Sequence, residues 1–496
     1  MGKIERPRET FVSKFGFMGA MFGWASATTI YYAVGFQAIM YGGGAFWIVL
    51  LIAFPTVLLT MWLIDAGFGA WSRKAAPQAW YAITKSRFWY FISWLGQLGN
   101  IGWAYAAINI AAWFLDYMVM SPFGEAFWTS SPSSFFWDKY LVTFRGGLIA
   151  IGLWAVIWVL LYRGIGIWAR FVLYARIVVL ILGVGWLAYA LSLPEFVQGM
   201  GFVFDFKPGA LVSSMTWTQG LLVTFWVLGA GGATAYASYL PRGGDINDST
   251  IMATISYLFF FFLFALSLPV LTLGARIPPV FLGGVGVAVG AMPQVFNRLG
   301  IPLLGLAFYG LVIFSALPAL VGWTEAGMTS FMDKLGWTRA RVATVVCVVG
   351  MIISSAIFGF PGYDAWNYEN FGTTLIWAHY YWEAVVYSIV SISAFIILLK
   401  FFGVAKLLEV LNEASAIKLS PNVFKSMLGV GIILTVGFLG FLFLSAFGVV
   451  PAGMAGTILG DGTGWYGLTP TGIGILSLIV FGMYIIPALI LTLRPE

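Results

Sequence analysis

The chain has 496 residues, of which 61% are apolar and only 9% are charged, whereas soluble proteins carry about 25% charged residues. This composition excludes a soluble globular protein. The net charge of +6 does not indicate nucleic-acid binding, because membrane proteins collect Lys and Arg at their cytoplasmic side. The single cysteine, Cys347, excludes a disulfide within the chain. The sequence therefore predicts an all-α polytopic protein whose main partner is the lipid bilayer.

Apolar stretches long enough to cross a hydrocarbon core of about 30 Å recur along the chain after a polar N-terminal segment. That segment, residues 1–14, has no apolar core and cleavage site of a signal peptide. The segment 277–300 is interpreted as an outer loop with a short re-entrant or capping helix, or as a plain loop. Twelve transmembrane helices are predicted, at 15–41, 45–70, 88–120, 145–162, 167–193, 215–239, 250–275, 302–334, 340–359, 374–402, 425–449 and 468–493.

The basic residues predict the orientation of these spans. With the N-terminus inside, 20 of the 25 Lys and Arg residues fall in cytoplasmic segments or span ends, and 5 fall outside. Because basic residues favour the cytoplasmic side, we expect both termini to be cytoplasmic. We also expect the protein to lie in a prokaryotic cell membrane.

Four sequence blocks occur in order along residues 8–430. Together they resemble the neurotransmitter:sodium symporter family, whose members carry amino acids or amines by coupling them to sodium. The blocks are GFMGAMFG at 16–23 with Gln37, YGGGAF at 41–46 and Asp65; TFWVLGAGGATAYASYLPRGGDI at 224–246; FMDKLGWTR at 331–339; and FGVAKLLEVLN at 402–412.

The resemblance implies two five-helix units of inverted topology, at 15–193 and 215–402, followed by two further helices at 425–493. It also implies that the first and sixth helices are interrupted, so that backbone groups meet a ligand at the membrane midplane. Gly229 and Gly231 suit such a break, because glycine accepts unusual backbone angles. Close packing of helices through small residues is the alternative explanation of these glycines.

The resemblance further implies a substrate site and a cytoplasmic gate. The gate consists of Arg8 and Asp333 as an ion pair braced by Tyr239; in the alternative, Arg8 only orients the first helix and Asp333 faces water. The expected substrate-lining residues are Ser26, Thr28, Thr29, Gln97, Phe225, Gly229, Gly231 and Tyr257.

The chain departs from the family pattern at the positions that hold sodium. The side-chain ligands of the first site align with Ile30, Phe225 and Tyr257, and only Tyr257 keeps an oxygen. At the second site, Pro318 and Ala319 replace two hydroxyl-bearing residues, and Ser315 aligns with a ligand that uses only its backbone. Sodium needs several oxygen ligands to replace its hydration shell, so sodium coupling is not expected.

The substrate contacts and the outer gate have changed as well. A tyrosine that contacts the substrate carboxylate aligns with Gln97, and the outer-gate pair aligns with Ala33 and His379. Glu383 follows His379 by one helical turn, so both lie on one face. Histidine titrates near neutral pH and an intramembrane glutamate is costly. The two residues are therefore the candidate proton site, the alternative being an interfacial histidine beside a structurally paired glutamate.

Two further acids have expected roles. Asp65 aligns with a residue that supports the broken sixth helix, and Glu325 is expected near the inner gate. No metal-binding cluster or cofactor motif is found, so we expect no cofactor, no metal site and no enzyme activity. The sequence predicts a carrier of a small organic solute, an amino acid or amine, that is proton-coupled or uncoupled. The alternative is a transport-incompetent structural or accessory subunit of a larger membrane complex, with protein partners.

Overall fold

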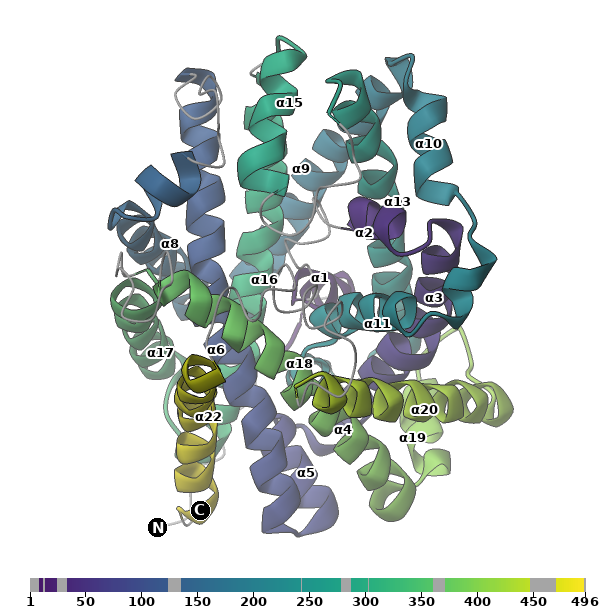
Figure 1. Cartoon of the computed structure of the whole chain (residues 1–496). Helices are drawn as coiled ribbons and strands as arrows, with labels where there is room; N and C mark the ends of the chain where they lie inside the picture. Colours follow the sequence, from purple (N-terminus) through teal and green to yellow (C-terminus); the bar gives the residue numbers. More distant parts are fainter. Residues whose placement is uncertain are drawn as a thin grey trace.

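The computed structural model describes residues 9–11, 14–24, 34–123, 135–241, 243–277, 287–301, 303–359, 371–446 and 470–494. These residues form helices joined by turns and loops (Figure 1), and there is no strand among them. A helix occurs in each of the twelve predicted spans. The predicted all-α class is therefore confirmed.

In the first half of the chain, the helix bounds follow the predicted spans closely, and short helices fill the connections. The helices within the predicted spans are α1 (Lys14–Trp24), α2 (Val34–Met40), α3 (Gly44–Ala53) continued by η2 (Phe54–Leu59) and α4 (Thr60–Ser72), α6 (Arg87–Met120), α8 (Arg145–Tyr162) and α9 (Ile165–Ser192). The connecting helices are α5 (Ala76–Thr84), η3 (Ser121–Phe123), η4 (Phe135–Tyr140), α10 (Phe196–Phe204) and η5 (Pro208–Val212).

In the second half, one predicted span is divided into two helices and the others are continuous or nearly so. The helices are α11 (Ser214–Leu228), α12 (Gly232–Ala237), α13 (Asn247–Gly274), α16 (Leu303–Leu335), α17 (Arg339–Ile353) continued by η8 (Ser354–Phe358), α18 (Phe371–Ile397) continued by η9 (Leu398–Phe402), α19 (Val404–Asn412), α20 (Pro421–Ala446) and α22 (Pro470–Leu493).

The segment predicted as a loop with a short helix contains helical structure. η7 (Val287–Ala291) and α15 (Met292–Arg298) are helical, and the hydroxyl of Tyr309 on α16 donates a hydrogen bond to the carbonyl of Ala288. Nearly all of the η7 residues are fully buried. The short-helix interpretation is therefore confirmed over the described residues.

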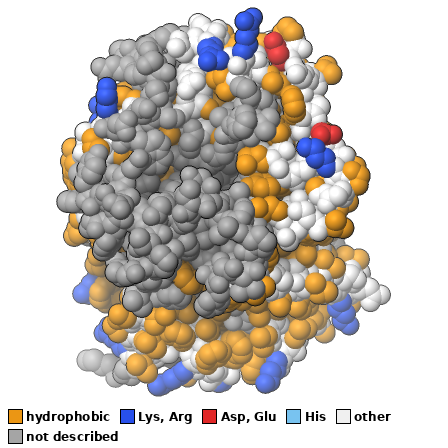
Figure 2. All heavy atoms as spheres, in the orientation of Figure 1, with side chains coloured by type: hydrophobic (Ala, Val, Ile, Leu, Met, Phe, Trp, Pro, Cys, Tyr) orange, Lys and Arg blue, Asp and Glu red, His pale blue; other side chains and the backbone are white. Residues whose placement is uncertain are grey.

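Apolar side chains cover much of the outer surface. Nine helices of the described residues are long and apolar enough to cross a membrane. Figure 2 shows hydrophobic side chains over the lower part of one face, with Lys and Arg along its lower edge. A belt of apolar side chains bordered by basic ones is the pattern expected of a protein embedded in a bilayer.

The centre of the molecule is built by close contact of α16 with α1 and α6 (Figure 1). A Cβ atom on Gly327 of α16 would lie 2.3 Å from Cδ1 of Ile101 on α6, and one on Gly322 would lie 2.7 Å from Cα of Trp24 on α1. Small residues let helix backbones approach closely where lipid supplies no hydrophobic drive between helices. Glycines on α16 therefore determine how near the three central helices lie.

The two described ends of the chain lie at the same end of α16. Nζ of Lys334 donates to the backbone carbonyl of Arg494 at 2.8 Å, and Glu9 is bound to Arg339, which follows α16 by a short turn. The membrane side of this end, the inverted-repeat boundaries and the cytoplasmic location of the termini stay predictions.

Candidate functional site

The sixth predicted span is interrupted at residues 229–231, between α11 and α12. Gly229 and Gly231 have positive φ angles of 58° and 66°, which side-chain-bearing residues adopt only at a cost. A Cβ atom on Gly231 would lie 2.6 Å from both Cβ of Ala76 and Nε2 of Gln97. Both positions therefore require glycine, and the predicted interruption is confirmed.

Polar side chains from α4 and α6 bind the backbone groups that the interruption frees. The carbonyl of Ala230 accepts hydrogen bonds from Nε2 of Gln97 at 2.6 Å and Nδ2 of Asn100 at 2.7 Å. The N–H of Gly231 donates to Oδ2 of Asp65 at 3.0 Å. Unsatisfied backbone groups inside a membrane are costly. Asp65 thus has the supporting contact expected of it, and Gln97 donates its side-chain amide to the break.

A second acid is connected to the break through two uncharged side chains. The hydroxyl of Tyr387 on α18 lies 2.9 Å from Oδ1 of Asn100 and is also hydrogen-bonded to Oε1 of Glu383. Glu383, Tyr387 and Asn100 are all buried. Because the Tyr387 hydroxyl has one proton, a continuous chain of hydrogen bonds leads from Glu383 to the carbonyl of Ala230 when Glu383 is protonated and donates to Tyr387.

Sequence reasoning selected Gln97 and Glu383 but missed the two side chains that join them. Asn100 follows Gln97 by three residues and Tyr387 follows Glu383 by four, so each lies on the same helix face as its selected neighbour. A search of these faces for further polar groups would have found both.

His379 has different contacts from Glu383, although both lie on α18. Its imidazole is fully buried, with Nδ1 2.8 Å from the hydroxyl of Tyr484 on α22. The ring also stacks on Trp103, with the two centroids 6.0 Å apart. The two candidate proton residues thus share a helix but face different partners. Their role in proton transfer stays a prediction.

Two predicted lining residues pack against other aromatic rings. Phe225 stacks on Phe438 of α20 with ring centroids 4.8 Å apart. Tyr257 packs edge-on against Phe22 and Phe261, at 5.9 and 5.1 Å. Both rings join helices through apolar contact. The three other predicted lining side chains lie outside the described residues: Ser26, Thr28 and Thr29.

The indole of Trp24 fills space beside the break. Trp24 is fully buried, and Cβ atoms on Gly229 and Gly232 would lie 2.1 and 2.4 Å from its ring. Its ring centroid is 5.9 Å from that of Trp62 and 6.0 Å from that of Tyr236. An aromatic side chain therefore borders the break where α1 approaches it.

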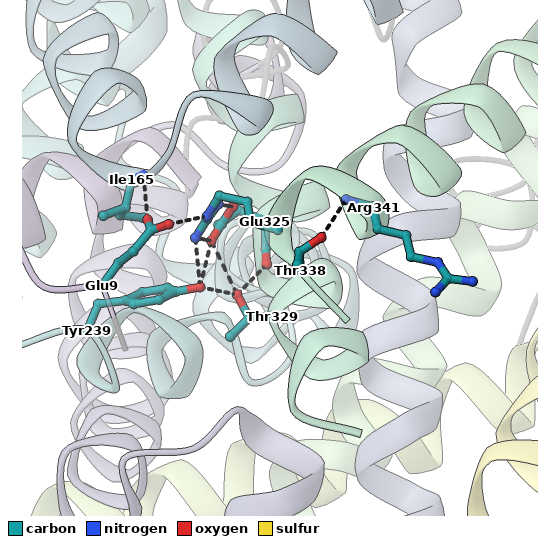
Figure 3. Close-up of polar contacts among 8 residues, drawn as sticks. Glu9, Ile165, Tyr239, Glu325, Thr329, Thr338 and Arg341 are labelled. Atoms are coloured by element: carbon teal, nitrogen blue, oxygen red, sulfur yellow. Dashed lines mark hydrogen bonds and ion pairs between the residues drawn. The ribbon is translucent and has the colours of Figure 1, made fainter. Parts of the chain in front are cut away.

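A cluster of charged residues lies at the end of α16, near the described start of the chain. Nη1 and Nη2 of Arg339 lie 2.7 and 2.8 Å from the two carboxylate oxygens of Glu325. Nη2 also donates to the hydroxyl of Tyr239 at 3.1 Å, and Nε donates to Oε1 of Glu9 at 2.9 Å. The other oxygen of Glu9 accepts the N–H of Ile165 at 3.0 Å. Figure 3 shows Glu9, Tyr239 and Glu325 turned toward one another.

This ion cluster, Glu9, Tyr239, Glu325 and Arg339, is unequally exposed. The side chain of Arg339 is 9% exposed and that of Glu325 is 1% exposed, whereas that of Glu9 is 44% exposed. Arg339 and Glu325 therefore form a buried bidentate ion pair, and Arg339 also binds the half-exposed Glu9 of the N-terminal segment. The cluster joins the chain start and α9 to α16, α17 and the turn after α12.

The predicted gate contributes one residue to the ion cluster. Tyr239 is part of it, whereas Arg8 lies outside the described residues. Asp333 accepts the N–H of Ala75 at 2.7 Å, at the start of α5. The Arg8–Asp333 pair stays a prediction. Arg339 stands in the third sequence block, but sequence reasoning did not pair it with Glu325.

Known proteins similar to this chain are transporters. It is 26% identical over 481 residues to the uncharacterized sodium-dependent transporter MJ1319 of Methanocaldococcus jannaschii, a match that covers 90% of this chain and 92% of the relative. A partial match at 23% identity covers 44% of this chain and 39% of the inactive sodium-dependent neutral amino acid transporter B(0)AT3 of Homo sapiens. No protein-family model matches the sequence.

The fold is similar to that of MhsT, whose crystal structure was solved in complex with L-phenylalanine. The TM-score is 0.74 at 19% identity, over 89% of this chain and 100% of that one. The similarity to these transporters over nearly the whole chain, together with the shared fold, indicates an integral membrane transporter rather than an enzyme. Within that class, the chain is similar to sodium-dependent transporters in sequence and to MhsT in fold, and this supports the resemblance to the neurotransmitter:sodium symporter family that its four sequence blocks predicted.

Proposed function

We propose that the protein moves a small organic solute, an amino acid or an amine, across the membrane by alternating access and without sodium coupling. The observation that carries the proposal is the interrupted helix at Gly229–Gly231, whose backbone is hydrogen-bonded to buried side chains of α4 and α6. Non-helical backbone is tolerated inside a membrane where it is buried in protein or lines a cavity, and helix ends there bind charged groups of a solute.

The side chains at the expected sodium positions support independence from sodium, although MJ1319 is named as sodium-dependent. Phe225 is stacked on Phe438, and Tyr257 packs edge-on against Phe261. Pro318 has no side-chain oxygen, and its Cβ would lie 3.5 Å from a Cβ on Gly23. Sodium loses its hydration shell only where several oxygens replace the waters. The side chains at these positions supply few oxygen atoms.

The hydrogen-bonded chain from Glu383 to Ala230 supports protons as the coupling ion. A carboxyl group that loses or gains a proton would change the hydrogen bond of Tyr387, and through Asn100 the contact made to the broken helix. We infer that Glu383 links protonation to the state of the break, and His379 is the second candidate for this role. The alternative to proton coupling is uncoupled transport, in which the solute moves down its own gradient.

Uptake into liposomes tests the proposal. Reconstituted protein is assayed with labelled L-phenylalanine and other amino acids and amines under a sodium gradient, a proton gradient or no gradient. Saturable uptake without sodium, raised by a proton gradient, is the expected result, and Glu383→Gln should abolish the proton effect. Asp205→Asn, at an exposed acid outside the spans, is the matched control. Uptake that requires sodium would overturn sodium independence.

A second function is favoured by the packing of Trp24. Its indole occupies space beside Gly229 and Gly232, as expected if the central site of an ancestral carrier had been filled. The protein would then be a structural or accessory subunit of a membrane complex. Purification in mild detergent tests this: a stoichiometric partner together with no binding of any tested solute favours the subunit, and solute binding by the isolated chain excludes it.

A further inference from the structure

A buried arginine lies in the middle of α9, and neither the ion cluster nor the break uses it. Arg176 is 7% exposed and stands 11 residues after the start of α9 at Ile165, about 16 Å along the helix. A charged side chain at this depth is costly and marks a functional position by default.

The guanidinium of Arg176 joins three helices. Its Nη1 donates to the hydroxyl of Ser315 on α16 at 2.9 Å, and its Nη2 lies 3.4 Å from the carbonyl of Phe22 on α1. Its Cζ atom lies 4.3 Å from the centroid of the Phe22 ring, within the range of a cation–π contact. The positive charge is therefore shared between a hydroxyl, a carbonyl and a ring face where α1, α9 and α16 meet.

The same place is where the sequence resemblance puts a sodium ion. Ser315 aligns with a backbone ligand of the second sodium, and Pro318 replaces a hydroxyl one turn further along α16. Gly23, next to Phe22, approaches both Val172 of α9 and Pro318 of α16. The guanidinium thus contacts the part of α16 that would hold the ion, and two of its contacts are oxygens of the kind that bind a cation.

We propose that Arg176 is a tethered cation that takes the place of an exchangeable sodium ion between α1 and α16. It supplies the positive charge that joins the two helices, and its charge keeps mobile cations out. Two unit charges about 4 Å apart at an effective dielectric of 20 repel strongly enough to weaken binding of a second cation about a thousandfold. The proposal deepens the sodium independence inferred above, and it concerns this one place in the fold.

Thermal unfolding of the purified full chain tests the proposal. Melting is followed in sodium chloride, potassium chloride and choline chloride at equal ionic strength. Wild-type protein should melt at the same temperature in all three. Arg176→Ala should melt several degrees lower in choline, and millimolar guanidinium or sodium should restore part of the loss with saturation. Arg176→Lys should keep most of the stability and show no sodium response.

Arg170→Ala is the matched control, because Arg170 lies on the same helix but is exposed and donates a hydrogen bond to the carbonyl of Gly166 on that helix. It should behave like the wild type in every salt. If Arg176→Ala does not fold, Ser315→Ala removes one partner of the guanidinium and should lower the melting temperature without creating a sodium response.

Two results would overturn the tethered cation: saturable sodium stabilisation of the wild type, or an Arg176→Ala melt equal to the wild type in every salt. The melts do not depend on transport. If no solute is taken up and the melting temperature of the wild type does not respond to sodium, the proposed carrier function is contradicted. The proposal that Arg176 replaces a sodium ion is then retained. Sodium-dependent uptake with the expected Arg176 melts would place the coupling ion at another site.

Discussion

The interrupted helix and the ion cluster hold the same molecule together by different physical means. At the break, neutral amides and one carboxylate bind peptide groups of residues 230 and 231. At the end of α16, Arg339 and Glu325 form a bidentate ion pair that reaches the N-terminal segment through Glu9. The first region is enclosed, whereas the second is open to water at Glu9.

This difference indicates which region opens. Peptide groups freed by the break have fixed partners on packed helices, and separating them would leave buried polar groups unsatisfied. The contact of Glu9 with Arg339 can be exchanged for water, because a half-exposed carboxylate is already partly hydrated. We therefore expect the break to be a permanent part of the scaffold and the Glu9 contact to be the part that separates.

The largest effect is expected at the buried half of the ion cluster. Arg339→Leu leaves Glu325 buried without its cation and should lower the free energy of unfolding by about 3–5 kcal/mol. Denaturant melts of the purified protein measure this. Arg341→Leu, on the same helix at an exposed position over Trp337, should cost less than about 1 kcal/mol. Equal losses for both variants would contradict the assigned burial.

The break should be almost as sensitive as the ion pair, but for steric reasons. Gly231→Ala adds a Cβ 2.6 Å from Ala76 and forces a side-chain-bearing residue to a φ of 66°, at a combined cost of about 3 kcal/mol. Gly243→Ala is the matched control: its φ is 68° with no atom near the added Cβ, so it should cost about 1 kcal/mol. If Gly231→Ala and Gly243→Ala lower the free energy of unfolding equally, Gly231 does not lie as close to Ala76 as described.

A smaller loss is expected where one of two amides at the break is removed. Asn100→Ala leaves the Ala230 carbonyl with Gln97 as its remaining side-chain donor and takes a partner from Tyr387. We expect a cost of about 1–3 kcal/mol and a weaker effect of protons on uptake. Asn422→Ala, at an exposed residue of α20, serves as the control. A proton response that is unchanged would remove Asn100 from the connection between Glu383 and the break.

The smallest effect on stability is expected at the exposed half of the ion cluster. Glu9→Gln should cost less than about 1 kcal/mol, and the cost should shrink at high salt because the contact is partly screened. Glu325→Gln should cost more, with little salt dependence. Reactivity of a cysteine placed near the start of α9 should rise in Glu9→Gln if this contact closes the pathway. If the reactivity of the cysteine is unchanged, the Glu9–Arg339 contact does not close the pathway.

The sequence predicted the features that depend on local pattern. Hydropathy predicted the membrane-spanning helices but not short connecting helices such as α5, α10 and α19, because an apolar stretch of the right length has few other structures inside a bilayer. The family resemblance predicted the break, and Gly229 and Gly231 suited it, because glycine accepts backbone conformations that exclude side chains. The lining residues on the first helix, Ser26, Thr28 and Thr29, stay predictions.

Partners distant in sequence were harder to find. Asn100 binds the carbonyl of Ala230, 130 residues away, and a carbonyl is present at every position, so residue type carries no signal. Arg339 and Glu325 are charged residues of complementary sign, but many such pairs exist near span ends. Only the turn between α16 and α17 brings these two together.

The start and the middle of α9 contact the N-terminal part of the chain at two points. At its beginning, the N–H of Ile165 binds Glu9, and about 16 Å further on Arg176 binds the carbonyl of Phe22. A helix fixed to another segment at two separate points cannot tilt without pulling on both. α9 thus has two attachments to the N-terminal part of the chain, and a tilt of α9 would release the contact at Ile165 and the contact at Arg176 in a single motion.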